Sequence, residues 1–368
     1  MQISKSLSNC RAANHSSVSV HRPLFPAPSP LFFIGGKYAP AHPAVLSKSM
    51  ANFSAFIETQ GCAILDGGLA TELENRGESL QSPLWSAKIL LSAPEKIADV
   101  HYAYFAAGAD IAITSSYQAT FPGLRAQGLD HRQAEAVLRQ SVTVAAEARE
   151  RFWSHPPNRK GRLRPLIAAS VGPYGAFLHD GSEYRGDYGI SRDALKSFHR
   201  ERLAVLADSG ADLLACESIP SLLEAEALLE LLHKLPNARA WISFTCKDET
   251  HISAGAKFSD AIALVCQSKA IVAAGLNCTA PRLVNALLEK ARRRTEKLLV
   301  AYPNSGELYD AATGAWRSAS EVGTIEQAAR GWRERGALLI GGCCRTTPET
   351  IRGIRSALIR APAGTGSS

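Results

Sequence analysis

Residues 337–348 read ALLIGGCCRTTP, an apolar run that ends in two glycines and two adjacent cysteines. A short, unbroken apolar run is typical of a strand that is buried on both faces of a parallel sheet. Adjacent side chains of a regular strand point to opposite faces, so both cysteines can reach one site only if the strand ends there, and glycines give the backbone that freedom. Free cysteine is also among the most buried side chains, so the pair alone is equally consistent with two small core residues.

The same pattern, a short apolar run followed by an amphipathic helical stretch, occurs eight times from residue 61 onward. The predicted strands cover residues 63–65, 111–114, 166–171, 212–215, 240–245, 271–276, 298–301 and 337–340. The predicted helices cover residues 94–107, 132–152, 192–209, 222–235, 260–268, 282–294, 324–335 and 347–358. This alternation predicts an α/β fold with a parallel sheet.

Eight such units indicate a closed (β/α)8 TIM barrel, which we expect as a single domain over residues 56–362. A doubly wound open sheet is the structural alternative. No G-x-G-x-x-G motif follows the first strand, and no phosphate loop of the form G-x-x-x-x-G-K occurs in the chain. The nucleotide-binding signatures of open sheets are therefore missing, which favours the barrel.

Residues 1–55 differ from the rest of the chain in composition. Residues 1–50 are rich in Ser, Pro and Ala, and they contain five Lys or Arg residues and no acid. This composition is typical of a disordered tail or of an organellar transit peptide. A start at Met50, the second of the two methionines, would omit this segment and is a third interpretation. We expect a disordered leader over residues 1–55 on a cytoplasmic protein, with organellar targeting as the alternative.

Composition and charge limit the classes of function. The chain has 368 residues, and no apolar run approaches the roughly 20 residues of a membrane span, so we expect no membrane partner. The leader carries five of the seven net positive charges, and the remaining net charge of about +2 gives no support for nucleic-acid binding. Eight cysteines without a compact framework indicate a reducing compartment and thiol chemistry. The sequence does not predict an oligomeric state.

Polar or thiol side chains follow seven of the eight predicted strands. In a TIM barrel these positions gather at one rim, where active sites form. The candidates, in chain order, are Asp66, Gly67, Gly68, Tyr117, Tyr174, Glu217, Asn277, Cys278, Tyr302, Cys343 and Cys344. We therefore expect one active site, built from segments that lie far apart in the sequence.

Three of these candidates are cysteines, whereas none of the ten histidines lies at a predicted strand end. Cys278 follows the sixth strand, and Cys343 and Cys344 follow the eighth, close enough around a barrel mouth to bind one ion at about 2.3 Å per sulfur. Zinc with three protein ligands keeps a fourth position for substrate, which is the arrangement of catalytic zinc. We predict a Zn2+ site on these three residues.

Five segments resemble the homocysteine S-methyltransferase family. In family order they are DGGLATEL at 66–73, SYQA at 116–119, GSEYRGDY at 181–188, YPNSGE at 302–307 and GGCCRTTP at 341–348. The chain is most similar to the short, cobalamin-independent members that use S-methylmethionine or S-adenosylmethionine. The resemblance implies zinc-dependent transfer of a methyl group from such a sulfonium donor to the thiolate of L-homocysteine, which forms L-methionine.

The resemblance leaves alternatives open. A betaine-dependent homocysteine methyltransferase is the nearest one, and selenocysteine is an alternative acceptor. The cobalamin-dependent methionine synthases need further domains, for which a chain of 368 residues has no room. Outside enzymes, the alternatives are a zinc or thiol redox sensor and a catalytically silent binding barrel. No adenine-binding signature decides between the two sulfonium donors.

The predicted acceptor site has to hold the ammonium and the carboxylate of homocysteine. We assign Asp66 and Glu217 to the ammonium; for Asp66, the alternative is a turn-forming Asp-Gly pair. The backbone amides of Gly67 and Gly68 are assigned to the carboxylate, because glycine allows close approach. Asn277 is assigned to the same substrate site.

The predicted donor pocket consists of aromatic side chains, because ring faces bind cations through their quadrupole. Its candidates are Tyr117, Tyr174, Tyr184, Tyr188 and Tyr302. Three of them lie in residues 172–190, a loop that is long for a barrel and is interpreted as a lid. The alternative is a surface loop whose tyrosines only pack against the rim.

Overall fold

The computed structural model describes residues 43–79, 86–306, 308–310, 315–317 and 325–359. Eight parallel strands form one sheet in the order β1-β10-β7-β6-β5-β4-β3-β2. They are β1 (Ala63–Ile64), β2 (Ile111–Ile113), β3 (Leu166–Val171), β4 (Leu213–Ile219), β5 (Ala240–Phe244), β6 (Ile271–Asn277), β7 (Leu298–Tyr302) and β10 (Ala337–Ile340).

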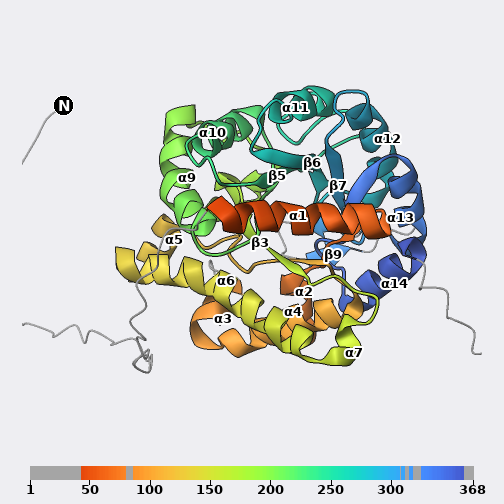
Figure 1. Cartoon of the computed structure of the whole chain (residues 1–368). Helices are drawn as coiled ribbons and strands as arrows, with labels where there is room; N and C mark the ends of the chain where they lie inside the picture. The colour runs from red at the N-terminus through yellow and green to blue at the C-terminus, as the bar shows by residue number, and fades with distance from the viewer. Residues whose placement is uncertain (1–42, 80–85, 307, 311–314, 318–324, 360–368) are drawn as a thin grey trace, which may run out of the picture. The chain divides into compact units, whose positions relative to one another are not determined.

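The two edges of this sheet meet, so that the strands form a closed barrel. A parallel bridge between Leu65 and Ile111 joins β1 to β2. On the other side of β1, the backbone N–H of Leu65 donates to the carbonyl of Ile340 at 2.8 Å. The helices surround the strands (Figure 1). The predicted single-domain (β/α)8 TIM barrel is confirmed.

All eight predicted helices are present, each within three residues of its expected bounds. They are α4 (Pro94–Ala107), α6 (His131–Ser154), α9 (Arg192–Ala207), α10 (Leu222–His233), α11 (Phe258–Val265), α12 (Pro281–Arg292), α13 (Ile325–Glu334) and α14 (Pro348–Leu358). Their starts follow the side chains that cap helices. Asp130 accepts the N–H of Gln133 at 2.8 Å at the start of α6, and Thr347 caps α14 directly before Pro348.

Several short elements were not predicted, because they are too short to show a periodic pattern. They are α2 (Leu69–Asn75), α3 (Ser86–Ser92), α5 (Phe121–Ala126), α7 (Pro156–Arg159), α8 (Tyr174–Leu178), the 3-10 helix η1 (Ser182–Tyr184) and the antiparallel strands β8 (Leu308–Asp310) and β9 (Ala315–Arg317).

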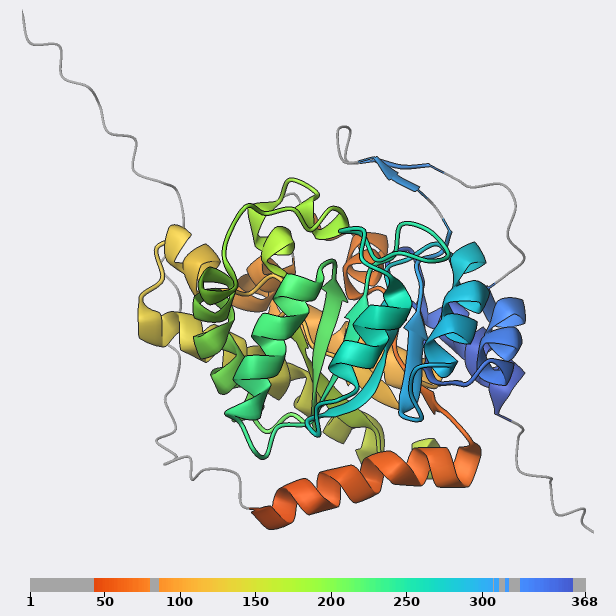
Figure 2. The same cartoon turned by 90° about the horizontal axis from the view of Figure 1, so that it is seen from above.

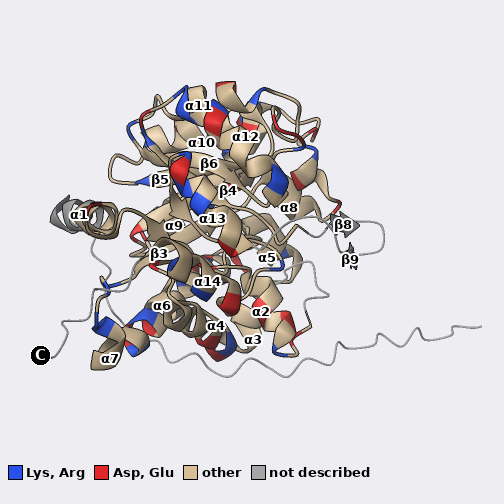
Figure 3. Ribbon diagram, turned by 90° about the vertical axis from the view of Figure 1, so that its right-hand side faces the viewer, with Lys and Arg blue, Asp and Glu red and all other residues tan. Residues whose placement is uncertain are grey.

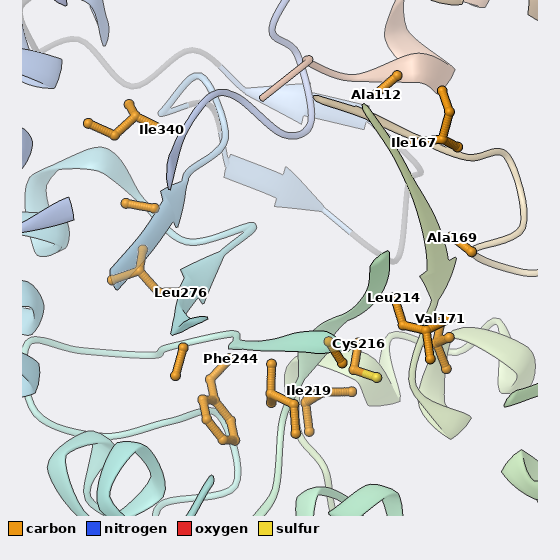
Figure 4. Packing of buried hydrophobic residues seen from close by; sticks show 14 of the residues in the cluster. Ala112, Ile167, Ala169, Val171, Leu214, Cys216, Ile219, Phe244, Leu276 and Ile340 are labelled. Carbon is orange, nitrogen blue, oxygen red and sulfur yellow. The ribbon is translucent and has the colours of Figure 1, made fainter. Parts of the chain in front are cut away.

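The core has two layers because successive strand residues point to opposite faces. In β3, Leu166 and Ala168 belong to the cluster inside the barrel, with Trp241 and Tyr302. Ile167 and Ala169 alternate with them and belong to the layer between strands and helices, part of which Figure 4 shows. Both layers are apolar on β3 from Leu166 to Ala169, which is why the sequence shows an apolar run there; Ser170, next on the inward face, is the polar exception.

Helix α1 (Pro43–Gln60) differs from the expectation of a leader that is disordered up to residue 55. Phe53 and Phe56 are 2% and 0% exposed and pack with the cluster inside the barrel. Figure 2 shows α1, in red, along one end of the barrel. The fold therefore includes residues from Pro43 onward. The predicted domain boundary at residue 56 falls inside this helix. The rest of the leader, residues 1–42, and residues 360–362 of the predicted domain lie outside the described residues.

Positions of Lys and Arg and positions of Asp and Glu are interspersed along the ribbon (Figure 3), in agreement with a barrel of small net charge. Ion pairs such as Arg192 with Glu226, at 3.1 Å, connect neighbouring helices. Among the described helices, none is both long enough and apolar enough to cross a membrane.

Candidate active site

The three predicted metal ligands lie together at the carboxyl ends of β6 and β10. The Sγ atom of Cys344 is 3.6 Å from that of Cys278 and 4.0 Å from that of Cys343. All three sulfurs lie within 4.8 Å of one another. Sulfurs that share a tetrahedral zinc at about 2.3 Å are separated by about 3.8 Å. The donor set and its spacing therefore fit one zinc ion.

The backbone around the thiols explains the glycines in front of them. A Cβ atom on Gly341 would lie 2.6 Å from the Cβ of Leu65, and one on Gly342 would lie 2.3 Å from Oγ1 of Thr346. Only glycine fits at such approaches. Cys278 itself has a left-handed φ of 47°, which turns the chain out of β6.

The three thiols shift one another's pKa values in opposite directions. Hydrogen bonds from Cys343 and then Cys344 lower the pKa of the Cys278 thiol well below its usual value. The same hydrogen bonds to Cys278 raise the pKa values of Cys343 and Cys344. The hydroxyl of Tyr184, 3.3 Å from the Cys278 sulfur, also lowers the pKa of Cys278. These hydrogen bonds therefore favour the thiolate form of Cys278.

A cavity next to the thiols is lined by three carboxylates, of which two were predicted. Burial raises the pKa of Asp66 well above its usual value, although its Oδ2 atom accepts the N–H of Ile113 at 2.8 Å. Burial raises the pKa of Glu217 to about 7, against hydrogen bonds from Ser170 and Tyr302. Glu183 is the third, and burial raises its pKa to about 7 as well.

Gly67 and Gly68 also line the cavity, but they make a close contact that the sequence did not indicate. The N–H of Gly68 donates to the carbonyl of Thr346 at 3.2 Å, and a Cβ atom on Gly68 would lie 2.8 Å from the carbonyl oxygen of Cys343. The amide of Gly68 is therefore engaged with the thiol-bearing turn, so we no longer assign it to a substrate carboxylate.

Asn277 differs from its predicted role. Its side chain is fully buried and is not among the residues that line the cavity. Its Oδ1 atom accepts the N–H of Ser218 at 2.7 Å and the hydroxyl of Ser243 at 2.8 Å. Its Nδ2 atom lies 3.9 Å from the sulfur of Cys343. Asn277 therefore connects the strand ends beneath the thiols, and its assignment to the substrate site stays a prediction.

The structure separates the five predicted tyrosines into two groups. Tyr117, Tyr184 and Tyr302 line the cavity, whereas Tyr174 and Tyr188 do not. The hydroxyl of Tyr302 donates to Glu217 at 3.1 Å, and its ring is buried inside the barrel. Tyr302 therefore orients the carboxylate, whereas Tyr117 and Tyr184 are the other two predicted tyrosines that line the cavity.

Tyr174 and Tyr188 lie in the β3 loop, by which we mean residues 172–190, and neither is among the residues that line the cavity. Their rings pack on each other with centroids 5.3 Å apart. The N–H of Tyr174 donates to Glu224 at 2.6 Å, and the hydroxyl of Tyr188 donates to the same carboxylate at 3.0 Å. These contacts connect both tyrosines to α10, and their role in a donor pocket stays a prediction.

Glu224 belongs to a buried polar network that the sequence analysis missed. His199 lies 2.8 Å from Glu224 and 2.9 Å from Arg202. Arg202 in turn donates to the carbonyls of Gly172 and Tyr117, at 2.5 and 3.4 Å. The network thus fixes the start of the β3 loop and its tyrosines. The sequence did carry a signal for this network, because Glu224, His199 and Arg202 lie on the apolar faces of two predicted helices.

The cavity is lined by further polar residues that the sequence analysis did not assign. They are Thr71, Thr114, Ser115, Gln118, Glu183 and Ser218. Thr114, Ser115 and Ser218 lie within two residues of a strand end, so the rule that found Asp66 applied to them too. Glu307, at the end of the fourth motif, lies outside the described residues.

Comparison with known proteins identifies the family. A family model described as homocysteine S-methyltransferase matches residues 63–358, which include every barrel strand and all three cysteines. The chain belongs to the homocysteine S-methyltransferase family. It is 51% identical to homocysteine S-methyltransferase YbgG of Bacillus subtilis over 298 residues, which cover 81% of this chain and 95% of that protein. It is 46% identical to homocysteine S-methyltransferase 1 of Arabidopsis thaliana, with coverage of 86% and 99%.

Solved structures of this family share the fold. The metallated form of the homocysteine methyltransferase MmuM from Escherichia coli superposes with a TM-score of 0.75 at 46% sequence identity. The match covers 83% of this chain and 99% of that one. The predictions of the family and of a methyltransferase enzyme are confirmed.

Proposed function

We propose that this enzyme uses zinc, held by Cys278, Cys343 and Cys344, to transfer a methyl group from a sulfonium donor to L-homocysteine, which forms L-methionine. The observation that carries the proposal is the group of three thiols within 4.8 Å beside a cavity lined by buried acids and aromatic rings. Family membership supports homocysteine as the acceptor.

The acceptor has to react as a thiolate, although a free thiol with a pKa near 8.5 is mostly protonated at neutral pH. Zinc bound by the three cysteines would supply the positive charge that keeps the acceptor sulfur deprotonated. Asp66 and Glu217 line the same cavity and would bind the ammonium group, and their buried position strengthens that contact. Tyr302 and Ser170 hold the carboxylate of Glu217 in place by hydrogen bonds. The amino acid is thereby oriented with its sulfur toward the cysteines.

The donor brings a fixed positive charge on sulfur. Tyr117 and Tyr184 line the cavity, and a cation over an aromatic ring gains about 0.5 to 2 kcal/mol. In the reaction the bond between donor sulfur and methyl carbon breaks, and its electron pair stays on the donor. The methyl carbon forms a new bond to the acceptor sulfur, and the acceptor's thiol proton leaves to solvent. The donor becomes a neutral thioether, so its departure needs no acid.

The test combines metal content with product formation. The purified full-length chain is expected to contain one zinc per chain and to form methionine from homocysteine with S-methylmethionine or S-adenosylmethionine. Betaine serves as the non-sulfonium comparison. Methionine formation from betaine alone, or full activity after metal removal by a chelator, would contradict the proposal.

A further inference from the structure

The carboxylate of Glu183 differs from the other two acids of the cavity. Its Oε2 atom is buried and accepts no hydrogen bond from the protein. Throughout the part of the chain that the structure describes, no other buried carboxylate oxygen lacks a partner. Asp66 and Glu217, by contrast, accept hydrogen bonds from Ile113 and Tyr302. A buried carboxylate oxygen without a hydrogen-bond partner is costly, so it calls for a ligand that supplies the missing interaction.

The protein holds Glu183 firmly at this place. Its carbonyl oxygen accepts the hydroxyl of Thr245, at the end of β5, at 3.2 Å. On the other side, a Cβ atom on Gly175 would lie only 2.3 Å from the backbone nitrogen of Glu183, so α8 packs directly against it. The buried network around Glu224 fixes the same loop through Tyr174 and Tyr188. The backbone that carries the unpaired carboxylate oxygen is therefore held in place by contacts on both sides.

The surroundings of Glu183 indicate the kind of ligand. Glu183 lines the same cavity as the three cysteines, and burial raises its pKa to about 7. A sulfonium ion has no N–H or O–H group, so it gains nothing from a precise hydrogen-bond acceptor. It requires an uncompensated negative charge and aromatic faces, and Glu183 with Tyr184 and Tyr117 offers both.

We infer that Glu183 is the counter-charge for the positively charged sulfur of the methyl donor, whereas Asp66 and Glu217 serve the ammonium of the acceptor. This inference rests on the proposed function. An ammonium has N–H donors, which suit acids that are already oriented by hydrogen bonds. The donor cation suits the one carboxylate oxygen that has no hydrogen-bond partner.

The charge balance of the reaction determines how Glu183 acts. When the methyl group leaves, the electron pair of the broken bond neutralises the donor sulfur, so the attraction to Glu183 weakens along the reaction path. Glu183 therefore stabilises the bound donor more than the transition state. It contributes to donor affinity and not to the rate of the chemical step, and it releases the neutral product.

The test is the variant Glu183→Gln in the full-length, zinc-loaded protein. The KM for S-methylmethionine is expected to rise at least about tenfold, with kcat unchanged or higher and the KM for homocysteine within about twofold. Calorimetry without homocysteine measures donor binding directly. S-methylmethionine should bind the variant more weakly than the wild type. Methionine, whose sulfur carries no positive charge, should bind both proteins equally. Glu183→Asp keeps the negative charge on a shorter side chain. Its KM for S-methylmethionine should lie between those of the wild type and Glu183→Gln.

Asp187→Asn is the matched control. It removes one negative charge from the same loop, but the Asp187 side chain is 77% exposed, so the donor KM should change by less than about twofold. Unchanged zinc content and melting temperature of Glu183→Gln show that site and fold are intact.

Two results would overturn the inference: an unchanged donor KM in Glu183→Gln, or an equal rise in KM for both substrates. Failure of the proposed function looks different, because the wild-type protein itself would then lack zinc or fail to transfer methyl from S-methylmethionine. If the wild-type protein is active and Glu183→Gln has the same kinetic constants, only the role of Glu183 is overturned.

Discussion

Single buried residues decide what the cavity can hold. Burial raises the pKa values of both Asp66 and Glu217, because it disfavours their charged forms. A cation that binds beside either side chain would therefore stabilise its carboxylate form. Glu217 lies within β4 and points into the barrel, where Ser170 and Tyr302 fix its two oxygens. A charge held in this way binds an ammonium in a defined orientation.

Glu217→Gln keeps the shape of this side chain and removes its charge. We expect a higher KM for homocysteine and a loss of about 1.5 to 4 kcal/mol in kcat/KM, as for a charge-assisted contact in a partly desolvated site. Zinc content should not change. The control is an acceptor thiol without an amino group, which should be far less sensitive to the substitution. Equal losses with both acceptors would mean that Glu217 supports the fold or the metal instead.

The raised pKa of Glu217 predicts that the stability of the protein depends on pH. Burial raises the pKa of Glu217 from 4.5 to about 7, so between these values the folded state binds more protons than the unfolded state. The free energy of unfolding therefore falls as pH rises through this window, with a slope of at most about 1.4 kcal/mol per pH unit from this group. Glu217→Gln removes this slope and should gain stability relative to wild type between pH 5 and pH 7.

Urea unfolding of the metal-free proteins at several pH values within this window measures the difference. Glu249→Gln, the same change at an exposed site, is the control and should follow the wild-type curve. Parallel curves for Glu217→Gln and wild type would contradict the buried, raised-pKa state of this group.

Replacing Cys278, Cys343 or Cys344 by Ser should remove most zinc and nearly all activity, because a three-thiolate site loses a third of its protein ligands. The melting temperature of the metal-free proteins should change little, since the apolar core does not depend on the metal. Cys266→Ser is the matched control, as this cysteine lies outside the cluster and should leave zinc content unchanged. A triple variant with full activity would exclude the metal mechanism.

At the level of elements, the buried network of Glu224, His199 and Arg202 connects α9 and α10 to the β3 loop. This loop carries Glu183 and Tyr184 to the cavity. Its position therefore depends on a few hydrogen bonds that lie away from the reacting atoms.

Tyr188→Phe removes one of these hydrogen bonds and keeps the ring. We expect a loss of about 1 kcal/mol in stability, faster amide hydrogen exchange in the β3 loop, and a higher KM for the methyl donor. Tyr102→Phe on α4 makes the same chemical change outside the loop and should leave loop exchange unchanged. Unaltered exchange in Tyr188→Phe would show that Glu224 does not hold the loop.

Strand positions in the sequence were enough to locate the site, but not to orient every side chain in it. The cluster of thiols was predictable because Cys278, Cys343 and Cys344 all follow strand ends of one barrel. The sequence shows that Asn277 ends β6, whereas the direction of its side chain depends on Ser218 and Ser243 from neighbouring strands. The contacts of Tyr174 and Tyr188 could not be predicted for the same reason, since their partner Glu224 lies on another helix.

At the scale of the whole molecule, α1 covers one end of the barrel, and the β3 loop, yellow-green in Figure 2, lies at the other. The composition of the leader obscured α1, because an acid-free, Ser- and Pro-rich segment lacks the pattern of a surface helix. Only its contacts with the barrel interior, through Phe53 and Phe56, reveal that it belongs to the fold.

Phe56→Ala should cost about 3 to 5 kcal/mol in the free energy of unfolding, as for a large buried aromatic residue, with kcat nearly unchanged. Glu58→Ala, at an exposed position of the same helix, should cost little. A chain that starts at Met50 keeps both phenylalanines and should lie within about 1 kcal/mol of the full chain. Denaturant titrations of all three compare these effects; a small loss in Phe56→Ala would mean that α1 is dispensable.

The bridge between Leu65 and Ile111 has a mechanical consequence. Hydrogen bonds between Asp110 and Ile64 lie on one side of this single bridge, and those of Asp66 lie on the other. The N–H of Asp66 donates to Ile111, and its carboxylate accepts the N–H of Ile113. Asp66 thus helps to close the barrel, besides its proposed role in binding the substrate ammonium. A substitution there loosens the closure and the binding site together, so its kinetic loss measures both.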